Sequence, residues 1–374
     1  MQETALIFRC DATPTIGIGH VKRCLALAAW AQKRGIPCYI AARFLTDAIK
    51  HELQESHIGY LPLSPPTQAQ SEDCSRASEV SYEQWLGVPW EVDADDTLAA
   101  IATAGLSGVL VVDHYGIDHR WERRLRRGSN AIFVIDDLAN RQHDCDVLLD
   151  QTLGREPTDY ARWIPSPCTL LLGTSYALLR PEFAAHRGLA ESRRRTATGV
   201  RRIFVSLGGT DAHNLTEVVL NALSAQLGQT DIIVDVVLSR AAPHFDRIVA
   251  AVVSAPLQIT VHADSFDVAK LMVDADLAVG AAGTMSWERA CLGLPTVMVV
   301  TADNQRQIAD ALAHTDAVDF IGDWRSVDAK TIAASVRRFS DDSSRWRRAV
   351  DAAFAICDGR GAERVLNQIA IGSR

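Results

Sequence analysis

The feature that most constrains the fold is an alternation that repeats along the whole chain. A short run of β-branched and apolar residues ends in glycine or aspartate, and a segment with helical periodicity follows. Strands and helices that alternate in this way form α/β domains with parallel sheets. We expect strands at residues 5–10, 38–42, 109–113 and 132–136 in the first half, and at 203–207, 232–238, 259–262, 277–280 and 296–300 in the second.

The length of 374 residues is enough for two domains or more, because one domain usually takes ~150 residues. Arginine, threonine and glycine at 191–200 interrupt the apolar rhythm and predict a linker. We therefore expect a Rossmann-like domain at 1–190 and a second at 201–374. The last helical segment, 343–371, is broken near Gly359 and could pack back on the first domain. Residues 64–89 have little periodicity and predict an insertion or a long loop.

Composition excludes several classes of protein. Hydrophobic residues make up 48% and charged residues 22%, as in a soluble globular protein. The apolar runs are shorter than the ~20 residues of a membrane span, and a net charge of −8 argues against nucleic-acid binding through a basic face. The eight cysteines show no CxxC pair and predict neither a zinc ribbon nor disulfides. The first residues do not resemble a secretion signal, so we expect a cytoplasmic protein.

Two charged segments have simpler explanations than ligand binding. Residues 143–146 contain Asp-x-Asp but precede an apolar run, whereas a metal–diphosphate site would usually follow a strand; we expect neither a metal nor a cofactor. A membrane surface could attract the arginines near Trp121, although a solvated helix face is the commoner arrangement. These arginines are Arg120, Arg123, Arg124, Arg126 and Arg127.

The first expected strand leads into a candidate site. Asp11 follows this strand, and a turn containing Gly17 and Gly19 leads to His20 at the start of a helix. Glycines let a backbone approach a ligand closely. The helix macrodipole disfavours a second positive charge here, so we expect a neutral imidazole that can act as a general base, with capping or packing as the alternative. The turn is not GxGxxG, which argues against dinucleotide binding.

Polar residues follow other expected strands of the first half. Asp113, His114 and Tyr115 stand at the end of one, and Asp136 and Asp137 at the end of the next. Since parallel strands end at one edge of a sheet, these residues predict a polar pocket. Tyr115 could position a water molecule or a sugar hydroxyl, or simply pack, and the aspartates could be helix caps.

The second half has two glycine turns between a strand and a helix, where backbone amides suit a phosphate. The first contains Gly208, Gly209 and Thr210, and the second Gly283 and Thr284. A plain turn is the alternative in each case.

Three further polar residues of the second half are candidates for sugar or nucleotide contacts. Glu288 could hold a ribose diol through its two carboxylate oxygens, or interact with the helix dipole. Asn304 and Gln305 follow a strand and could orient a sugar or phosphate. Asn304 could instead be an N-cap.

Taken together, these motifs resemble the UDP-sugar hydrolase family of pseudaminic acid biosynthesis, which acts on UDP-2,4-diacetamido-2,4,6-trideoxy-β-L-altropyranose. The matching segments occur in the family's order, whereas 64–93 matches nothing in it. The segments are 9–11, 16–23, 113–117, 175–183, 208–211 and 304–305.

The resemblance implies a glycosyltransferase B fold, with two facing Rossmann-like domains and a cleft between them, similar to the lipid II synthase that transfers N-acetylglucosamine. It also implies metal-independent hydrolysis that releases UDP by cleaving the anomeric C–O bond with inversion.

Residue roles follow from the same resemblance. His20 would be the general base, Tyr115 and Asn304 would line the site, and Glu288 with the Gly-Gly-Thr turn would hold UDP. Arg180 would be a further binding candidate. The expected partners are a UDP-sugar and water, without nucleic acid, and the oligomeric state is open. Related sporulation polysaccharide sequences leave another deoxy amino sugar possible; a glycosyltransferase or a non-catalytic nucleotide-sugar-binding subunit are the alternatives.

Overall fold

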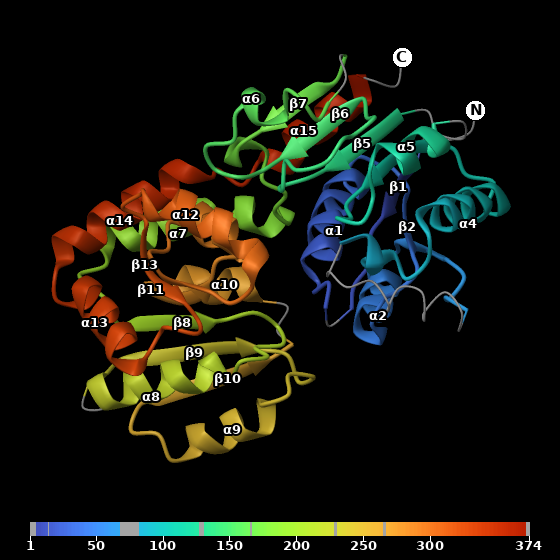
Figure 1. Cartoon of the computed structure of the whole chain (residues 1–374). Helices are drawn as coiled ribbons and strands as arrows, with labels where there is room; N and C mark the ends of the chain where they lie inside the picture. Colours follow the sequence, from blue (N-terminus) through green and yellow to red (C-terminus); the bar gives the residue numbers. More distant parts are fainter. Residues whose placement is uncertain are drawn as a thin grey trace. The chain divides into compact units, whose positions relative to one another are not determined.

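The computed structural model describes residues 5–13, 15–67, 82–126, 131–164, 167–227, 230–264 and 267–371 (Figure 1). The chain divides into two compact units. The first comprises residues up to Arg180 together with those from Arg360 onward, and the second comprises Pro181–Gly359. None of the described helices is long and apolar enough to cross a membrane.

The described residues of the first unit form a seven-stranded sheet in the order β3-β2-β1-β4-β5-β6-β7. Each neighbouring pair runs parallel, as the sequence predicts. The strands are β1 (Ala5–Arg9), β2 (Cys38–Ala42), β3 (Gly59–Pro62), β4 (Gly108–Val112), β5 (Ala131–Ile135), β6 (Val147–Asp150) and β7 (Thr169–Leu172).

Helices cover both faces of this sheet. Leu6 and Phe8 of β1 belong to a core with α1, α2 and α15, while Ala5 and Ile7 belong to a core with α4 and α5. Burial on both faces explains the continuous apolar sequence of β1. The helices are α1 (Gly19–Gln32), α2 (Asp47–Glu55), α4 (Trp90–Thr103), α5 (His119–Leu125), α6 (Pro157–Tyr160) and α15 (Gly361–Ile371), with short 3₁₀ helices η1 (Tyr82–Leu86) and η2 (Thr174–Tyr176).

The described part of the second unit has a six-stranded parallel sheet in the order β10-β9-β8-β11-β12-β13. Its strands are β8 (Arg202–Ser206), β9 (Ile233–Leu238), β10 (Gln258–Ala263), β11 (Leu277–Ala281), β12 (Thr296–Val300) and β13 (Val318–Asp323). Its helices are α7 (Pro181–Thr196), α8 (Leu215–Leu227), α9 (Phe245–Val253), α10 (Val268–Asp274), α11 (Met285–Cys291), α12 (Arg306–Ala313), α13 (Ala329–Ser340) and α14 (Ser343–Ile356), with the 3₁₀ helix η3 (Asp303–Gln305).

The expected linker at 191–200 differs from the structure, because helix α7 continues through Thr196. The buried Arg194 anchors this helix to the second unit: its guanidinium donates to three backbone carbonyls, those of Met272, Ala275 and Leu292. The border between the units therefore falls between Arg180 and Pro181, not between residues 190 and 201.

The last helices divide between the units. Helix α14 contributes Trp346 and Ala349 to the core of the second unit. After Gly359 the chain returns to the first unit, where Val365 and Leu366 of α15 join the core that contains α1. The last helix of the expected domain at 201–374 therefore belongs to the first unit, an arrangement that the sequence analysis left open.

Candidate active site

His20 lies at the start of α1, where its side chain meets the residue that follows β4. Its Nδ1 is 2.6 Å from Oδ1 of Asp113, and only 5% of the residue is exposed. Because a carboxylate can only accept, Nδ1 carries the proton and donates it. Among the described residues, the other ring nitrogen, Nε2, has no hydrogen-bond partner. The ring is therefore held in the tautomer whose Nε2 can accept a proton.

Arg23, one helical turn after His20, fixes the charge of this carboxylate. It donates to both oxygens of Asp113 at 2.5 and 2.7 Å, and to Asp137 at 2.6 Å. Burial opposes ionisation of Asp113, but the Arg23 guanidinium and His20 outweigh it and lower the pKa of Asp113 to about 2. Asp113 is thus an ionised acceptor throughout the neutral range.

Tyr115 completes this cluster. Its hydroxyl donates to Asp137 at 2.5 Å, and its ring meets the His20 ring nearly edge-on, with centroids 4.5 Å apart. Burial, followed by the negative charge of Asp137, raises the pKa of Tyr115 well above its ordinary value. The hydroxyl stays protonated and commits its hydrogen to Asp137, so a ligand would meet only its oxygen lone pairs.

The turn before α1 follows the expected glycine pattern. Gly17 has a φ of +77°, a conformation that favours glycine, and its N–H donates to the carbonyl of Thr13 at 2.8 Å. Gly19 is the first residue of α1, and no side chain caps that helix. Both glycines are half-buried and hold His20 at the edge of the sheet.

Asp11 has a structural role in place of the expected substrate contact. It has no exposed surface, and its Oδ1 accepts the backbone N–H groups of Arg43 and Phe44 at 2.7 and 2.9 Å. Burial would raise the pKa of Asp11, but the Arg9 guanidinium outweighs it and holds that pKa below its ordinary range. A fully covered carboxylate has nothing to offer a substrate; it ties the loop after β2 to the end of β1.

In the second unit, Gly208, Gly209 and Thr210 follow β8. Gly208 has a φ of +101°, and Gly209 and Thr210 are exposed. The next residue, Asp211, accepts the N–H groups of Leu215 and Thr216, both at 2.9 Å. Because Asp211 already caps α8, a phosphate here would meet the turn's own amides and not the amides that Asp211 occupies.

The structure brings Gln305 together with the second glycine turn. Its Oε1 accepts the N–H of Thr301 at 2.9 Å, and its Nε2 lies 3.8 Å from where a Cβ on Gly283 would stand. The turn is also held by the buried Arg289, which donates to the carbonyl of Ala281 at 2.8 Å. Asn304, the preceding residue, is exposed on η3.

Three other predicted residues are partly accessible. Thr284 precedes α11 without making a side-chain cap, and Glu288 lies in the first turn of that helix. Both are half-buried, as is Arg180 at the end of the first unit. The predicted residues thus fall into two groups, one in each unit.

The two charged segments considered for other roles are committed to ion pairs. Arg120, Arg123, Arg124 and Arg126 each contact a carboxylate, while Arg127 lies outside the described residues. In the segment 143–146, His143 pairs with the buried Glu122 at 2.7 Å. The ion pairs of the arginines neutralise much of the positive charge that could attract a membrane surface.

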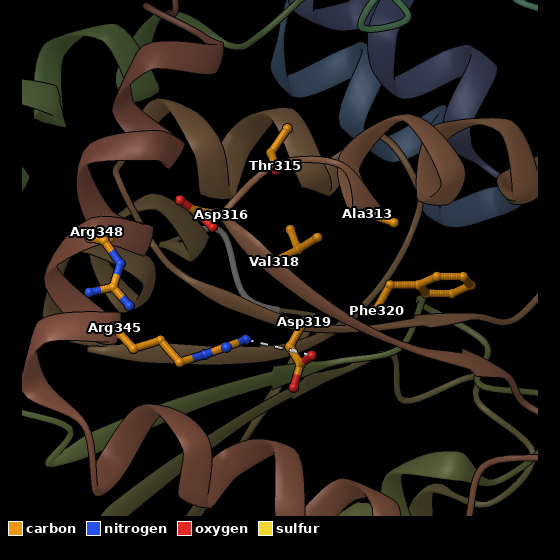
Figure 2. A pocket seen from close by; sticks show the side chains of 8 residues that line it. All are labelled: Ala313, Thr315, Asp316, Val318, Asp319, Phe320, Arg345 and Arg348. Carbon is orange, nitrogen blue, oxygen red and sulfur yellow. Dashed lines mark ion pairs between the residues drawn. The ribbon is translucent and has the colours of Figure 1, made fainter.

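Two cavities lie outside these groups. One, of about 310 Å³, is at the carboxyl ends of the first strands, and Thr13, Arg43 and Lys50 contribute to its wall. The other, of about 300 Å³, is at the beginning of β13 (Figure 2), where Arg345 lies 3.7 Å from Asp319. Since β13 begins there, this second cavity is at the sheet edge opposite the glycine turns.

The sequence reasoning missed three residues of the His20 cluster. Arg23 could have been placed in the cluster from the sequence, because it lies one helical turn after His20 on the expected helix. Tyr82 and Trp85 come from η1, inside the segment expected to be a loop, and both contact the ring of Tyr115. Their segment has no periodic pattern from which this contact could be inferred.

Comparison with known proteins relates the chain to nucleotide-sugar enzymes, although no family model matches it. It is 25% identical over 308 residues to the UDP-2,4-diacetamido-2,4,6-trideoxy-beta-L-altropyranose hydrolase of Campylobacter jejuni, covering 82% of this chain and 96% of that protein. It is 26% identical over 193 residues to the spore coat polysaccharide biosynthesis protein SpsG of Bacillus subtilis, covering 52% of this chain and 56% of that protein.

The solved structures define the fold. MurG of Acinetobacter baumannii matches with a TM-score of 0.64 and 14% identity, over 98% of this chain and 99% of that one. UGT2 of Phytolacca americana, in complex with UDP-2fluoro-glucose and pterostilbene, matches with a TM-score of 0.68 and 12% identity, over 99% and 100%. The protein therefore has the glycosyltransferase B fold. Within that class, the chain is similar to the Campylobacter UDP-sugar hydrolase over most of its length, in agreement with the motif resemblance.

Proposed function

We propose that the protein is a hydrolase that releases UDP from a UDP-linked 2,4-diacetamido-2,4,6-trideoxy sugar. The observation that carries the proposal is the His20–Asp113 pair at 2.6 Å, which leaves Nε2 of His20 as a proton acceptor. The relationship to the Campylobacter hydrolase supports this substrate class.

In the proposed reaction, His20 removes a proton from a water molecule that attacks the anomeric carbon. The C–O bond to UDP breaks, and attack from the opposite face inverts the configuration. A positioned general base is worth ~10²–10⁴ in rate. The oxygen lone pairs of Tyr115 and the exposed amide of Asn304 are the candidates for orienting the water and the sugar.

UDP is proposed to bind to the second unit. The amides of the turn 208–210 and the turn with Gly283 and Thr284 would contact the diphosphate, and Glu288 would contact the ribose. UDP leaves as an anion, so the reaction needs charge stabilisation at the diphosphate, which backbone N–H groups can supply. No metal is part of this proposal. The mechanism requires the sugar of the bound nucleotide to reach His20.

Hydrolysis in ¹⁸O-labelled water tests the proposal. The substrate is a UDP-2,4-diacetamido-2,4,6-trideoxy sugar without any added acceptor. We expect one ¹⁸O atom in the released sugar and none in UDP, because water attacks carbon. Label in UDP would mean attack on phosphorus and would overturn the mechanism.

A glycosyltransferase is the second candidate, favoured by the cavity of about 310 Å³ at the carboxyl ends of β1 and β2. An acceptor bound there would take the place of water. The same experiment separates the two reactions, since a transferase would release UDP only when an acceptor is added.

Replacing Glu288 with alanine is expected to weaken UDP binding. A hydrogen bond to a charged group contributes about 1.5–3 kcal/mol, so the Kd for UDP should rise about 10-fold to 150-fold. Isothermal titration with UDP measures the change. Glu191→Ala is the matched control, because Glu191 is half-buried like Glu288 and pairs with Arg195 on α7. An unchanged affinity in Glu288→Ala would refute the ribose contact.

A further inference from the structure

A cluster of aromatic rings lies beside His20, and two of its members, Tyr82 and Trp85, belong to η1. The ring of Trp85 lies 6.2 Å from that of His20 and 5.6 Å from that of Tyr115, between centroids. The ring of Tyr82 lies 4.8 Å from Trp85 and 5.1 Å from Tyr115. The rings of Tyr115, Trp85 and Tyr82 contact one another, and the first two also contact the ring of the proposed base.

Glycines on both sides adapt the backbone to this arrangement. A Cβ on Gly116, next to Tyr115, would come within 2.5 Å of the carbonyl oxygen of Tyr82. Gly87, directly after η1, has a φ of +71°, and a Cβ there would meet the ring of Phe44 at 2.7 Å. Glu83 of η1 also contacts Arg120 at 2.6 Å. The sequence thus fits η1 closely against the loop after β4 that carries Tyr115 and Gly116.

Trp85 carries a buried donor that this part of the chain does not satisfy. The side-chain Nε1 of Trp85 is buried and has no hydrogen-bond partner among the described residues, while the residue as a whole is half-buried. A buried N–H without an acceptor is unfavourable, because it has lost its hydrogen bond to water and gained none in the protein. Such a donor beside a catalytic group is ready to pair with an acceptor that a ligand brings.

The sugar of the proposed reaction carries groups that can bind to this aromatic cluster. The Campylobacter enzyme's substrate name specifies two acetamido groups and a deoxygenated C6, which is a methyl group. Methyl groups pack on aromatic faces, and an amide carbonyl accepts a hydrogen bond from an indole N–H. A sugar with hydroxyls at these positions would instead leave polar groups against the rings.

On these grounds, and resting on the proposed function, we propose that Tyr82 and Trp85 form the subsite for the acetamido and methyl side of the sugar. The indole Nε1 of Trp85 donates to an acetamido carbonyl, and the rings of Trp85 and Tyr82 pack on the methyl groups. The subsite selects deoxy acetamido sugars over their hydroxylated counterparts.

The test compares Trp85→Phe, which keeps a ring but loses the N–H, with Trp85→Ala. The two substrates are the UDP-diacetamido-trideoxy sugar and its analogue with hydroxyl groups at C4 and C6. For the first substrate we expect kcat/KM to fall about tenfold in Trp85→Phe, mainly through KM, and about 100-fold in Trp85→Ala. For the hydroxylated analogue both variants should change kcat/KM by less than about threefold. Trp163→Phe, at another half-buried tryptophan of the first unit, is the control.

A binding measurement separates this proposal from the proposed function. Saturation-transfer NMR on the free diacetamido sugar with UDP present should show its acetamido methyl signals with the wild type, and not with Trp85→Ala. If these signals occur but no UDP-sugar is hydrolysed, the function fails and the subsite stands. If hydrolysis occurs but the two substrates respond equally to Trp85→Phe, or the signals persist in Trp85→Ala, the subsite is refuted.

Discussion

The variant His20→Gln is expected to lower kcat by about two to four orders of magnitude and to leave UDP affinity nearly unchanged. Glutamine can still donate a hydrogen bond to Asp113, but it cannot accept a proton from water at neutral pH. The loss therefore measures general-base catalysis, which contributes ~10²–10⁴ in rate. Steady-state UDP release gives kcat, and titration with UDP gives the affinity.

Two further measurements make this test specific. His51→Gln is the control, because His51 lies on α2 with 71% of its side chain exposed; its activity should equal that of the wild type. In His20→Ala, added imidazole should restore part of the turnover by occupying the vacated space. Unchanged turnover in His20→Gln would remove His20 from the mechanism.

The second large effect is expected from Asp113→Asn, and it concerns both stability and rate. Asparagine removes the negative charge that compensates the buried Arg23, and breaking a buried ion pair costs about 3–5 kcal/mol. Asparagine can also donate to Nδ1 of His20, which would move the ring proton to Nε2 and remove the base. We expect the unfolding free energy to fall by about that amount, and kcat to fall by ~10²–10⁴ in the folded variant.

Acid titration of stability supplies the independent measurement for Asp113. Folding lowers its pKa from an ordinary value of 3.8 to about 2, so its contribution to stability is complete above pH ~4 and is lost as the pH falls toward 2. Urea unfolding between pH 6 and 2 should show a smaller acid loss in Asp113→Asn than in the wild type. Asp310→Asn, at an exposed position of α12, is the control. Equal acid loss in Asp113→Asn and the wild type would contradict this account of the carboxylate.

The central strands could be predicted from the sequence because their signals are local. All nine expected strands are confirmed, each to within one residue at either end. β1 is buried along its whole length, and such strands show as unbroken apolar runs.

The four missed strands lack this signal. β3, β6 and β7 have only four residues each, and β3 contains a glycine and a proline, residues that usually mark turns. β13 is half-buried throughout and contains two aspartates and a glycine. The pairing of these strands depends on neighbours in the sheet, which the local sequence does not specify.

The residues of the candidate site likewise divide into those that could be predicted from the sequence and those that could not. His20, Asp113 and Tyr115 could be grouped from the sequence because each follows a parallel strand, and such strands end at one edge. Their exact pairing could not, since it depends on Arg23 and Asp137 completing the charge balance. Asp11 follows a strand too, but the side that it faces is covered, and burial is not visible in the spacing of residues.

The first unit consists of two separate stretches of the chain, with the second unit between them in the sequence. Its last helix, α15, packs against α1 near the start of the chain. The second unit, in contrast, is continuous. Synthesis proceeds at about 5–20 residues per second. The face of α1 that packs against α15 therefore stays uncovered until α15 has been made. The first unit, whose synthesis begins first, is therefore completed only after the second unit has been made.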